Sequence, residues 1–327
     1  MAMGRDRIHR RTVLTAIGVA AVSVSASLAG CGETTAEWTP ATVPTDATLY
    51  DVGTTATGAV AVGEDGIVLT RGDESWTVAL PNGPGGTADT LRSLAVTNNG
   101  RAVWAAGDSG ALGLYDVVAD QAVDFSAPKE MTSSWTAVAV AGLAGEERIT
   151  ALNGSGELLH GQRDGTSVEW AEVIEPGTGS SVTDVAITPL SYVYTVDTDG
   201  GAFESRDGGD TWTRIGIDAA AVDFDAVAAV DSGAVSVAGG DGTVWNYNGV
   251  GWSRASLAET AITALVRNRY DALAIASSGD LFERDFDGWT TQTTLPAQND
   301  PLAITLGTSR APELVVGESG MVIERQY

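Results

Sequence analysis

The chain has 327 residues, enough for one large domain or two ordinary ones, and a formal net charge of −25. Acidic residues outnumber basic residues by 43 to 18, so the surface as a whole repels nucleic acid and anionic bilayers, and we exclude polyanion binding. The sequence has one cysteine, Cys31, and two histidines, His9 and His160. These counts permit no internal disulfide and leave little material for a catalytic triad or a histidine-rich metal site.

The basic residues are almost all arginine, because Lys129 is the only lysine. An acid-rich, lysine-poor composition is similar to that of proteins from salt-loving archaea. At molar salt the Debye length is about 3 Å, which screens the self-repulsion that this charge would cause in dilute buffer. An ordinary acidic protein is the alternative.

The first 30 residues read as an export signal. Arg10 and Arg11 precede a weakly apolar run of Ala, Val, Ser and Gly that ends at Leu28-Ala29-Gly30-Cys31. This resembles a twin-arginine signal joined to a lipobox, which implies cleavage before Cys31 and lipidation of that cysteine. The alternative, an uncleaved transmembrane anchor, is disfavoured because the run is short and rich in Ser and Gly.

The predicted lipid anchor fixes the expected location. Loss of residues 1–30 removes four arginines and one aspartate and leaves a charge of about −28. Residues 31–36 form a short tether, whose reach is roughly 20 Å at ~3.5 Å per residue. We therefore expect an extracytoplasmic domain, residues 37–327, held close to the cell membrane.

A repeat fills the chain after residue 36. In each copy a β-branched run ends in a turn with glycine, a second apolar strand follows, and an aromatic residue stands about ten residues later. The turn glycines are separated by 44, 46, 44, 42, 37 and 41 residues and are Gly66, Gly110, Gly156, Gly200, Gly242, Gly279 and Gly320. This period, with short strands and no helical pattern, predicts an all-β, seven-bladed β-propeller.

The two ends of the chain complement each other. The seventh repeat stops after its third strand, whereas "EWTPATVP" near residue 38 matches the outer strand of the first repeat, "SWTVALPN". We predict that Trp38 lies on the outer strand of blade seven and closes the ring. We expect the recurring aromatic residues to begin each fourth strand and to be buried between adjacent sheets. They are Trp38, Trp76, Phe125, Trp170, Trp212, Trp252 and Trp289.

The stretch "SRDGGDTW" carries the most specific motif. Ser205, Asp207, Gly209, Thr211 and Trp212 match the pattern S-x-D-x-G-x-T-W at every fixed position. This Asp-box resembles those of sialidase-type propellers and of the photosystem II assembly and stability factor family. Acid and hydroxyl groups of such a turn bond its own amides, so we predict a structural staple on the hairpin between third and fourth strands.

Another acidic stretch, "DTDGGAFE" (197–204), superficially resembles a calcium loop. It lacks the third carboxylate before the glycine, and Gly208 stands where the closing glutamate should be. We interpret it as a hairpin turn, and we predict neither a metal site nor a cofactor.

The first functional hypothesis is a non-catalytic binding or assembly scaffold. The resemblance to the photosystem II assembly factor family implies a propeller that holds a membrane or surface protein, with the propeller itself monomeric. The arginines that mark that family's partner surface contrast with the strongly acidic composition of this chain.

The alternatives are a surface glycan-binding or adhesion module and, less favoured, a sialidase-like glycosidase. Sialidases need an arginine triad, a tyrosine nucleophile with a glutamate, and an aspartate. The candidate positions on the inner strands include one arginine; they are Tyr50, Asp51, Arg92, Thr136, Thr183, Asp184, Asp225 and Thr263. A quinone-dependent dehydrogenase is disfavoured further, because no recurrent tryptophan docking motif is present.

Any ligand is expected in the funnel on the propeller axis, where the inner strands converge. Tyr50, Arg92 and Asp225 are the candidate binding residues there. Solvated strand ends without a ligand are the alternative interpretation of these three.

Overall fold

The computed structural model describes residues 37–73, 75–177, 182–217, 222–296 and 299–326. The chain divides into Met1–Thr35 and a compact unit, Ala36–Tyr327. The predicted signal residues Arg10 and Arg11, the lipidation site Cys31 and the tether therefore lie outside the described residues. Within the described ranges, no helix has the length and apolar character needed to cross a membrane.

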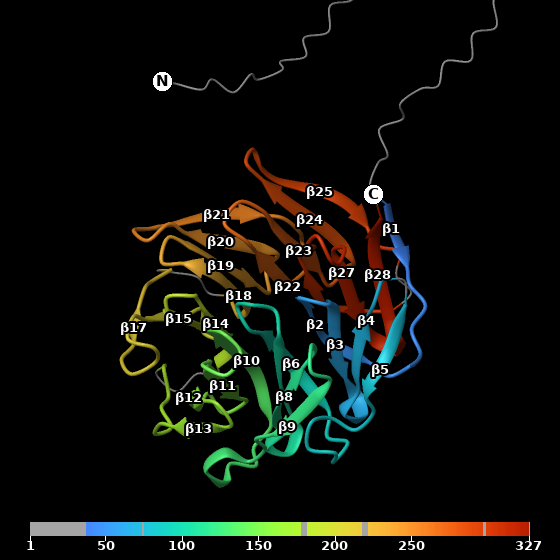
Figure 1. The fold of residues 1–327 in the computed structure, drawn as a ribbon. Coiled ribbons are helices and arrows are strands. Elements are labelled where there is room, and N and C mark those ends of the chain that lie inside the picture. Colours follow the sequence, from blue (N-terminus) through green and yellow to red (C-terminus); the bar gives the residue numbers. More distant parts are fainter. Residues whose placement is uncertain (1–36, 74, 178–181, 218–221, 297–298, 327) are drawn as a thin grey trace, which may run out of the picture. The chain divides into compact units, whose positions relative to one another are not determined.

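The compact unit is a seven-bladed β-propeller, as the repeat predicts (Figure 1). Each blade is a four-stranded antiparallel sheet, and each inner strand contacts the inner strands of both neighbouring blades. The inner strands are β2 (Leu49–Thr55), β6 (Leu91–Val96), β10 (Trp135–Ala141), β14 (Val182–Ile187), β18 (Phe224–Asp231), β22 (Ile262–Arg267) and β26 (Pro301–Thr305). The candidate inner-strand positions named from the sequence, Tyr50 to Thr263, all lie on six of these strands.

The other strands follow in order from the axis outward. The second strands are β3 (Gly58–Gly63), β7 (Ala102–Gly107), β11 (Arg148–Asn153), β15 (Val193–Asp197), β19 (Ala234–Gly239), β23 (Ala272–Ala276) and β27 (Leu314–Gly317). The third strands are β4 (Val68–Arg71), β8 (Leu112–Asp116), β12 (Leu158–Asp164), β16 (Ala202–Ser205), β20 (Thr243–Tyr247), β24 (Asp280–Asp285) and β28 (Met321–Gln326). The outer strands are β5 (Trp76–Leu80), β9 (Gln121–Asp124), β13 (Ser167–Trp170), β17 (Thr213–Arg214), β21 (Trp252–Ser256), β25 (Gly288–Thr294) and β1 (Glu37–Pro40).

The turns between second and third strands explain the spacing of the glycines. All seven predicted turn glycines have a left-handed backbone, with φ between 68° and 84°. A side chain at such a φ is strained, so glycine recurs there in every blade. Three of these turns form single 3-10 turns, η1 (Glu64–Gly66), η2 (Asp108–Gly110) and η4 (Glu318–Gly320), and η3 (Pro128–Glu130) precedes blade three.

The ring is closed by the first strand. β1 pairs antiparallel with β28, with Trp38 opposite Arg325 and Thr39 opposite Glu324. The sheet order β1-β28-β27-β26 makes β1 the outer strand of blade seven, which confirms the predicted closure. The termini of the propeller thus hydrogen-bond to each other and leave no unfinished blade.

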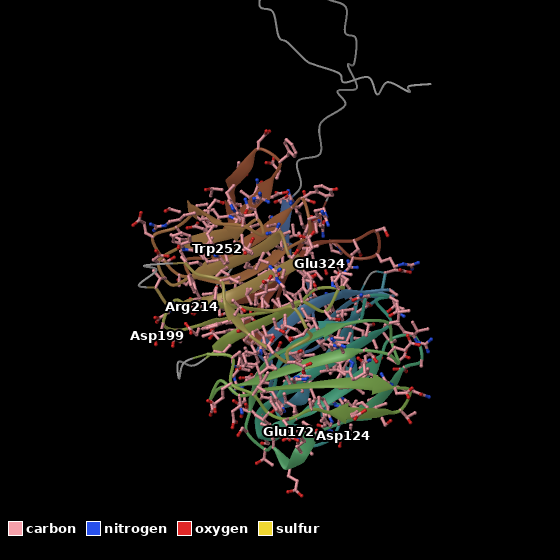
Figure 2. The ribbon with its side chains drawn as sticks, turned by 90° about the vertical axis from the view of Figure 1, so that its left-hand side faces the viewer. Asp124, Glu172, Asp199, Arg214, Trp252 and Glu324 are labelled. Atoms are coloured by element: carbon pink, nitrogen blue, oxygen red, sulfur yellow. The ribbon has the colours of Figure 1, made fainter. Side chains whose placement is uncertain are left out.

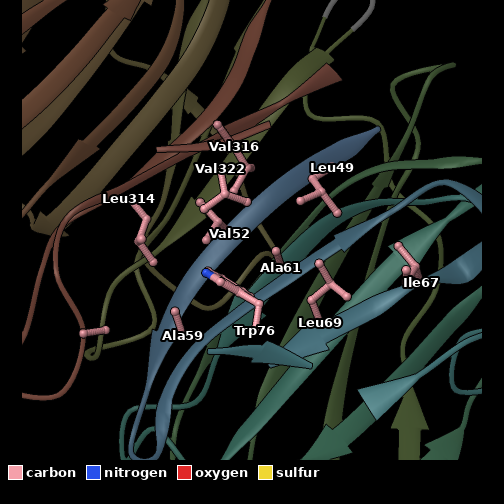
Figure 3. Packing of buried hydrophobic residues seen from close by; sticks show 12 residues of the cluster. Leu49, Val52, Ala59, Ala61, Ile67, Leu69, Trp76, Leu314, Val316 and Val322 are labelled. Carbon is pink, nitrogen blue, oxygen red and sulfur yellow. The ribbon is translucent and has the colours of Figure 1, made fainter. Parts of the chain in front are cut away.

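The aromatic residues of the repeat pack between adjacent sheets. Trp76, for example, joins a cluster that contains Leu49 and Leu69 of blade one and Leu314 and Val322 of blade seven (Figure 3). Trp38 and Trp76 are buried, with 8% and 5% of their surface exposed, whereas Trp170, Trp212, Trp252 and Trp289 are half-buried. The expectation of full burial therefore holds for two of these tryptophans.

The prediction that every aromatic residue begins its fourth strand is wrong in two blades. Trp170 is the last residue of β13, where it lies over Gly161, and Phe125 follows the end of β9. Phe125 stacks on Trp104, with ring centroids 4.9 Å apart. Trp104 of the second strand β7 and Trp135 of the inner strand β10 are fully buried in the same inter-blade cluster, so blades two and three fill their junction from strands nearer the axis.

Candidate functional site: the axial pocket

The inner strands share one irregularity. In every blade the pairing of the inner strand with the second strand skips the second residue of the inner strand. The skipped residues are Tyr50, Arg92, Thr136, Thr183, Asp225, Thr263 and Leu302. Such a β-bulge leaves one residue unpaired and re-aims its side chain. All seven line one pocket at the propeller axis, with a volume of about 240 Å³.

The structure therefore brings together the three candidate binding residues, Tyr50, Arg92 and Asp225, and the other five inner-strand positions that the sequence singled out. It adds Leu302 of blade seven, which a search for polar side chains does not find. Ser93 and four alanines, Ala137, Ala226, Ala264 and Ala303, also line the pocket. The side chain at the bulge is thus polar in six blades and apolar in blade seven.

Tyr50 and Arg92 form the cationic part of the wall. The Arg92 guanidinium lies 5.3 Å from the centre of the Tyr50 ring. Its Nε and Nη2 donate to the two carboxylate oxygens of Asp108 at 2.6 and 2.9 Å. The hydrogen bond from Arg92 is the main cause that lowers the pKa of Asp108. The guanidinium is 39% exposed, so it is oriented by Asp108 and still reachable from the pocket.

Asp51 and Asp184 occupy the position after the bulge in blades one and four. Each carboxylate accepts the N–H of its own successor, Val52 or Val185, at 2.8 Å. Each also accepts an N–H of the next inner strand, from Leu94 or Val227, again at 2.8 Å. These bonds tie neighbouring blades together at the axis.

Burial raises the pKa of both carboxyl groups. The pKa of Asp51 is raised to about 6, chiefly by desolvation, against the lowering effect of its hydrogen bonds. The pKa of Asp184 is raised to about 7 by desolvation, and the charge of Asp51 adds to this shift. Both groups therefore change charge near neutral pH, within one pocket.

The carboxyl group of Asp225 has a different surrounding. Among the described residues, no group donates a hydrogen bond to it, and burial together with the charge of Asp223 raises its pKa. Asp225 is the acidic side chain of the pocket with an unfilled acceptor capacity.

Backbone amides complete the polar lining. In blades one to five the N–H of the fourth residue of the inner strand donates to a side chain, which is Asp51, Ser93 or Asp184. The matching residues of blades six and seven, Leu265 and Ile304, line the pocket in the same register. No side chain in the described part of the protein accepts from their N–H groups, and alanine stands before each of them and at the equivalent position of the preceding blade. The carboxylates of Asp51, Asp184 and Asp225 belong to blades one, four and five, and these two amides without a side-chain acceptor belong to blades six and seven, which lie between blades five and one.

The Asp-box lies on the β16–β17 hairpin and bonds to itself. Gly209 N–H donates to Ser205 Oγ at 2.8 Å, and Ser205 Oγ donates to Asp207 at 2.8 Å. Thr211 donates to Asp207 through N–H and Oγ1, at 2.9 and 2.6 Å. Trp212 Nε1 donates to the Gly209 carbonyl at 2.9 Å. Hydrogen bonds from Thr211 are the main cause that lowers the pKa of Asp207 to about 2.

The stretch 197–204 is the β15–β16 turn. Asp197 Oδ1 accepts the N–H groups of Asp199 and Gly201, at 3.0 and 2.6 Å, so this carboxylate is used by its own turn. In the part of the chain that the structure describes, no group of three or more His, Cys, Asp or Glu side chains is arranged to hold a metal ion.

Comparison with known proteins places the chain by its fold. No protein-family model and no curated protein matches the sequence. Among solved structures, YCF48 from Cyanidioschyzon merolae has 14% sequence identity and a TM-score of 0.68, over 88% of this chain and 98% of that protein. Virginiamycin B lyase from Staphylococcus aureus has 11% identity and a TM-score of 0.73, over 90% of this chain and 100% of the lyase. The WD40 repeats of RRP9 have 10% identity and a TM-score of 0.69, over 86% and 95% of the two chains. At these identities the likeness concerns the seven-bladed propeller fold.

Proposed function

We propose that this chain is an exported lipoprotein whose propeller binds a segment of a membrane or surface protein in its axial pocket. Residues 1–30 act as a twin-arginine signal, Cys31 carries the lipid, and residues 37–327 work outside the cytoplasm as a non-catalytic scaffold. The acidic, lysine-poor composition fits a high-salt environment.

The observation that carries this proposal is the ring of seven bulges. The same β-bulge recurs in every blade, but the seven bulges present side chains of very different chemistry to one pocket. A purely structural bulge has no need of tyrosine, arginine, aspartate and leucine at equivalent positions. Bulges are over-represented where a side chain is aimed at a ligand.

The lining suits a polar segment of polypeptide. The N–H groups of Leu265 and Ile304, which have no side-chain acceptor, can donate to a carbonyl or carboxylate, and Asp225 can accept from a basic or hydroxyl side chain. Similar folds are known with such ligands, since one solved structure is YCF48 bound to D1 peptide. With Asp51, Asp184 and Asp225 against Arg92, the pocket favours a segment with at least one cationic side chain.

A glycan is the second candidate ligand. Tyr50 offers an aromatic ring at the pocket wall, and the hydroxyl and carboxylate groups could bind sugar hydroxyls. Hydrolysis is not proposed, since Arg92 is the single arginine in the pocket and Asp108 already holds it. His160, on β12, lies at the pocket beneath the Asp-box and not at the axis.

The test is crosslinking in native membranes at high salt with the full-length lipidated chain, followed by mass spectrometry. A triple variant, Y50A/R92A/D225A, is compared with T77A/R214A/S253A, which changes three exposed residues of outer strands; Arg214 is marked in Figure 2. We expect one protein partner to crosslink to the wild type and the control variant and to be lost from the pocket variant. Equal yields from all three chains would overturn the axial site, and a partner captured only through its glycan would favour the second candidate.

A further inference from the structure

The two faces of the propeller are built from different connections. Strands alternate in direction, so the first–second and third–fourth hairpins of every blade end on one face, which we call the hairpin face. The second–third turns and the connections between blades lie on the other face. The axial pocket is lined by the beginnings of the inner strands, and Arg92 there binds Asp108 of the second–third turn η2. This second face is therefore the pocket face.

Exposed apolar side chains gather on the hairpin face. Seven large apolar residues are exposed among those described, and six of them lie at hairpin tips. The six, with their exposed fractions, are Val118 (57%), Leu143 (53%), Leu190 (73%), Val250 (93%), Tyr270 (69%) and Phe286 (99%). The seventh, Val78, lies on the outer strand β5. Single exposed apolar residues are common, but their restriction to one face indicates that this face meets an apolar phase.

The most exposed of these residues lie on blades five and six, and blade six is next to the blade at which the chain enters the propeller. Val250 tips the β20–β21 hairpin of blade five, and Phe286 tips the β24–β25 hairpin of blade six. Blade six adjoins blade seven, in which Glu37 at the start of β1 pairs with Gln326 at the end of β28 (Figure 1). The end of β28 corresponds to a third–fourth hairpin tip, so residue 37 enters the propeller on the hairpin face.

Charge does not separate the two faces in the same way. The second–third turns contain no Arg or Lys, and most contain Asp or Glu, as in η1, η2 and η4. The hairpin tips carry the exposed arginines Arg101, Arg206 and Arg269, but each is paired with an acid, and exposed Asp285 and Asp287 stand on either side of Phe286. Molar salt screens these acids near a bilayer, so the apolar tips and the entry of the chain decide the orientation.

We propose that the hairpin face of blades five and six rests on a lipid bilayer, with Phe286, Tyr270 and Val250 at the depth of the headgroups. This inference rests on the proposed lipidation of Cys31. A tether of residues 31–36 reaches roughly 20 Å, so the face that it enters must be the one near the membrane. Aromatic and aliphatic side chains add binding energy in proportion to the apolar area that they bury there. The axial pocket then opens away from the membrane, toward its partner.

The test uses one label on each face of blade six. Cys31 is the only natural cysteine and is consumed by the lipid, so F286C and S278C each introduce a single free thiol. Phe286 and Ser278 are both exposed, at opposite ends of β24. The lipidated chains carry a fluorophore at these thiols and are reconstituted in phosphatidylcholine–phosphatidylglycerol vesicles in molar KCl. We expect brominated lipids to quench the label at position 286 several-fold more than the label at position 278.

Further variants test the apolar tips themselves. In the F286C chain, V250S/Y270S should reduce the quenching, whereas V78S, which changes the exposed valine away from the tips, should leave it unchanged. Equal quenching at positions 286 and 278, or protection of position 286 only after a membrane-protein extract is added, would overturn the bilayer contact. The mass of the N-terminal peptide is measured separately, because absence of the lipid would contradict the proposed anchoring and not the orientation.

Discussion

The inner and outer edges of the blades join neighbouring sheets by different means. At the axis, one backbone pattern is repeated seven times, and its side chains range from Leu302 to Arg92. At the outer edge the backbone varies, since β17 has two residues and β25 has seven. Between the two edges, the same polar group recurs at two blade junctions. In both, a buried glutamate accepts hydrogen bonds from a tryptophan indole and an arginine.

The first of these groups closes the ring. Arg71 of blade one donates to both oxygens of Glu324 of blade seven at 2.8 Å, and Trp76 Nε1 donates to Glu324 at 3.0 Å. Between blades two and three, Glu147 accepts from Arg163 at 2.9 Å and from Trp104 at 3.4 Å. The difference indicates that these groups, together with Asp51 and Asp184 at the axis, hold the blades together, whereas the side chains at the bulges are free to vary for binding.

The largest expected effect comes from the closing group. Glu324→Ala leaves Arg71 and the indole of Trp76 buried without their acceptor, and it should lower the free energy of unfolding by about 3–5 kcal/mol. Thermal unfolding in molar KCl measures this. Glu172→Ala is the control, because the Glu172 side chain is 93% exposed in its pair with Lys129 and such pairs contribute little. A similar small change in both variants would show that closure does not depend on this group.

The buried carboxyl groups of Asp51 and Asp184 test whether residues at the inner edge affect the stability of the fold. Because burial raises the pKa of Asp51 to about 6 and that of Asp184 to about 7, the folded protein holds protons that the unfolded chain has already released above pH ~4. Raising the pH from about 4 to about 7 should therefore lower the free energy of unfolding, by on the order of 1–3 kcal/mol per group.

Asp51→Asn should flatten this pH dependence. Asparagine does not titrate in this range, and loss of the Asp51 charge also lowers the pKa of Asp184. Urea unfolding of the variant and the wild type at pH 4, 5.5 and 7 gives the difference. Asp287→Asn, at an exposed hairpin tip, serves as the control that changes the net charge equally. Parallel pH profiles for D51N and the wild type would contradict the assignment.

The Asp-box is an outer feature that acts within one hairpin. Asp207→Ala removes the acceptor of Thr211 and Ser205, so we expect a smaller decrease in Tm than for E324A. Since hydrogen bonds lower the pKa of Asp207 to about 2, its contribution is present above pH ~4 and is lost as the pH falls toward 2. Thermal scans of D207A and D207N at pH 7 and pH 2.5 test both statements, and a decrease equal to that of E324A would make the hairpin a joint between blades.

The sequence predicts the features that depend on local geometry. The left-handed turns need glycine, so Gly66 and its six equivalents mark the blades, and Trp38 marks the missing outer strand. The pairing of Trp104 with Glu147 joins residues 43 positions apart through the packing of two blades, which no local pattern reveals. The bulges cannot be predicted from the sequence for another reason. Their side chains are not selected by the backbone, so Leu302 carries no polar signal and is found only in the structure.

The smallest expected change in the free energy of unfolding is at Arg92, and it tests the comparison of the inner and outer edges of the blades. Its ion pair with Asp108 is 39% and 30% exposed, so Arg92→Ala should change the free energy of unfolding by less than about 1 kcal/mol. Partner binding should nevertheless be lost, because the guanidinium is the cationic group of the pocket wall. Thermal unfolding and crosslinking yield are measured on the same preparation, with Arg101→Ala, a similar exposed pair on the hairpin face, as the control. A loss of stability comparable to that of E324A would mean that the side chains at the bulges also hold the ring together. Its varied side chains would then need an explanation in packing instead of binding.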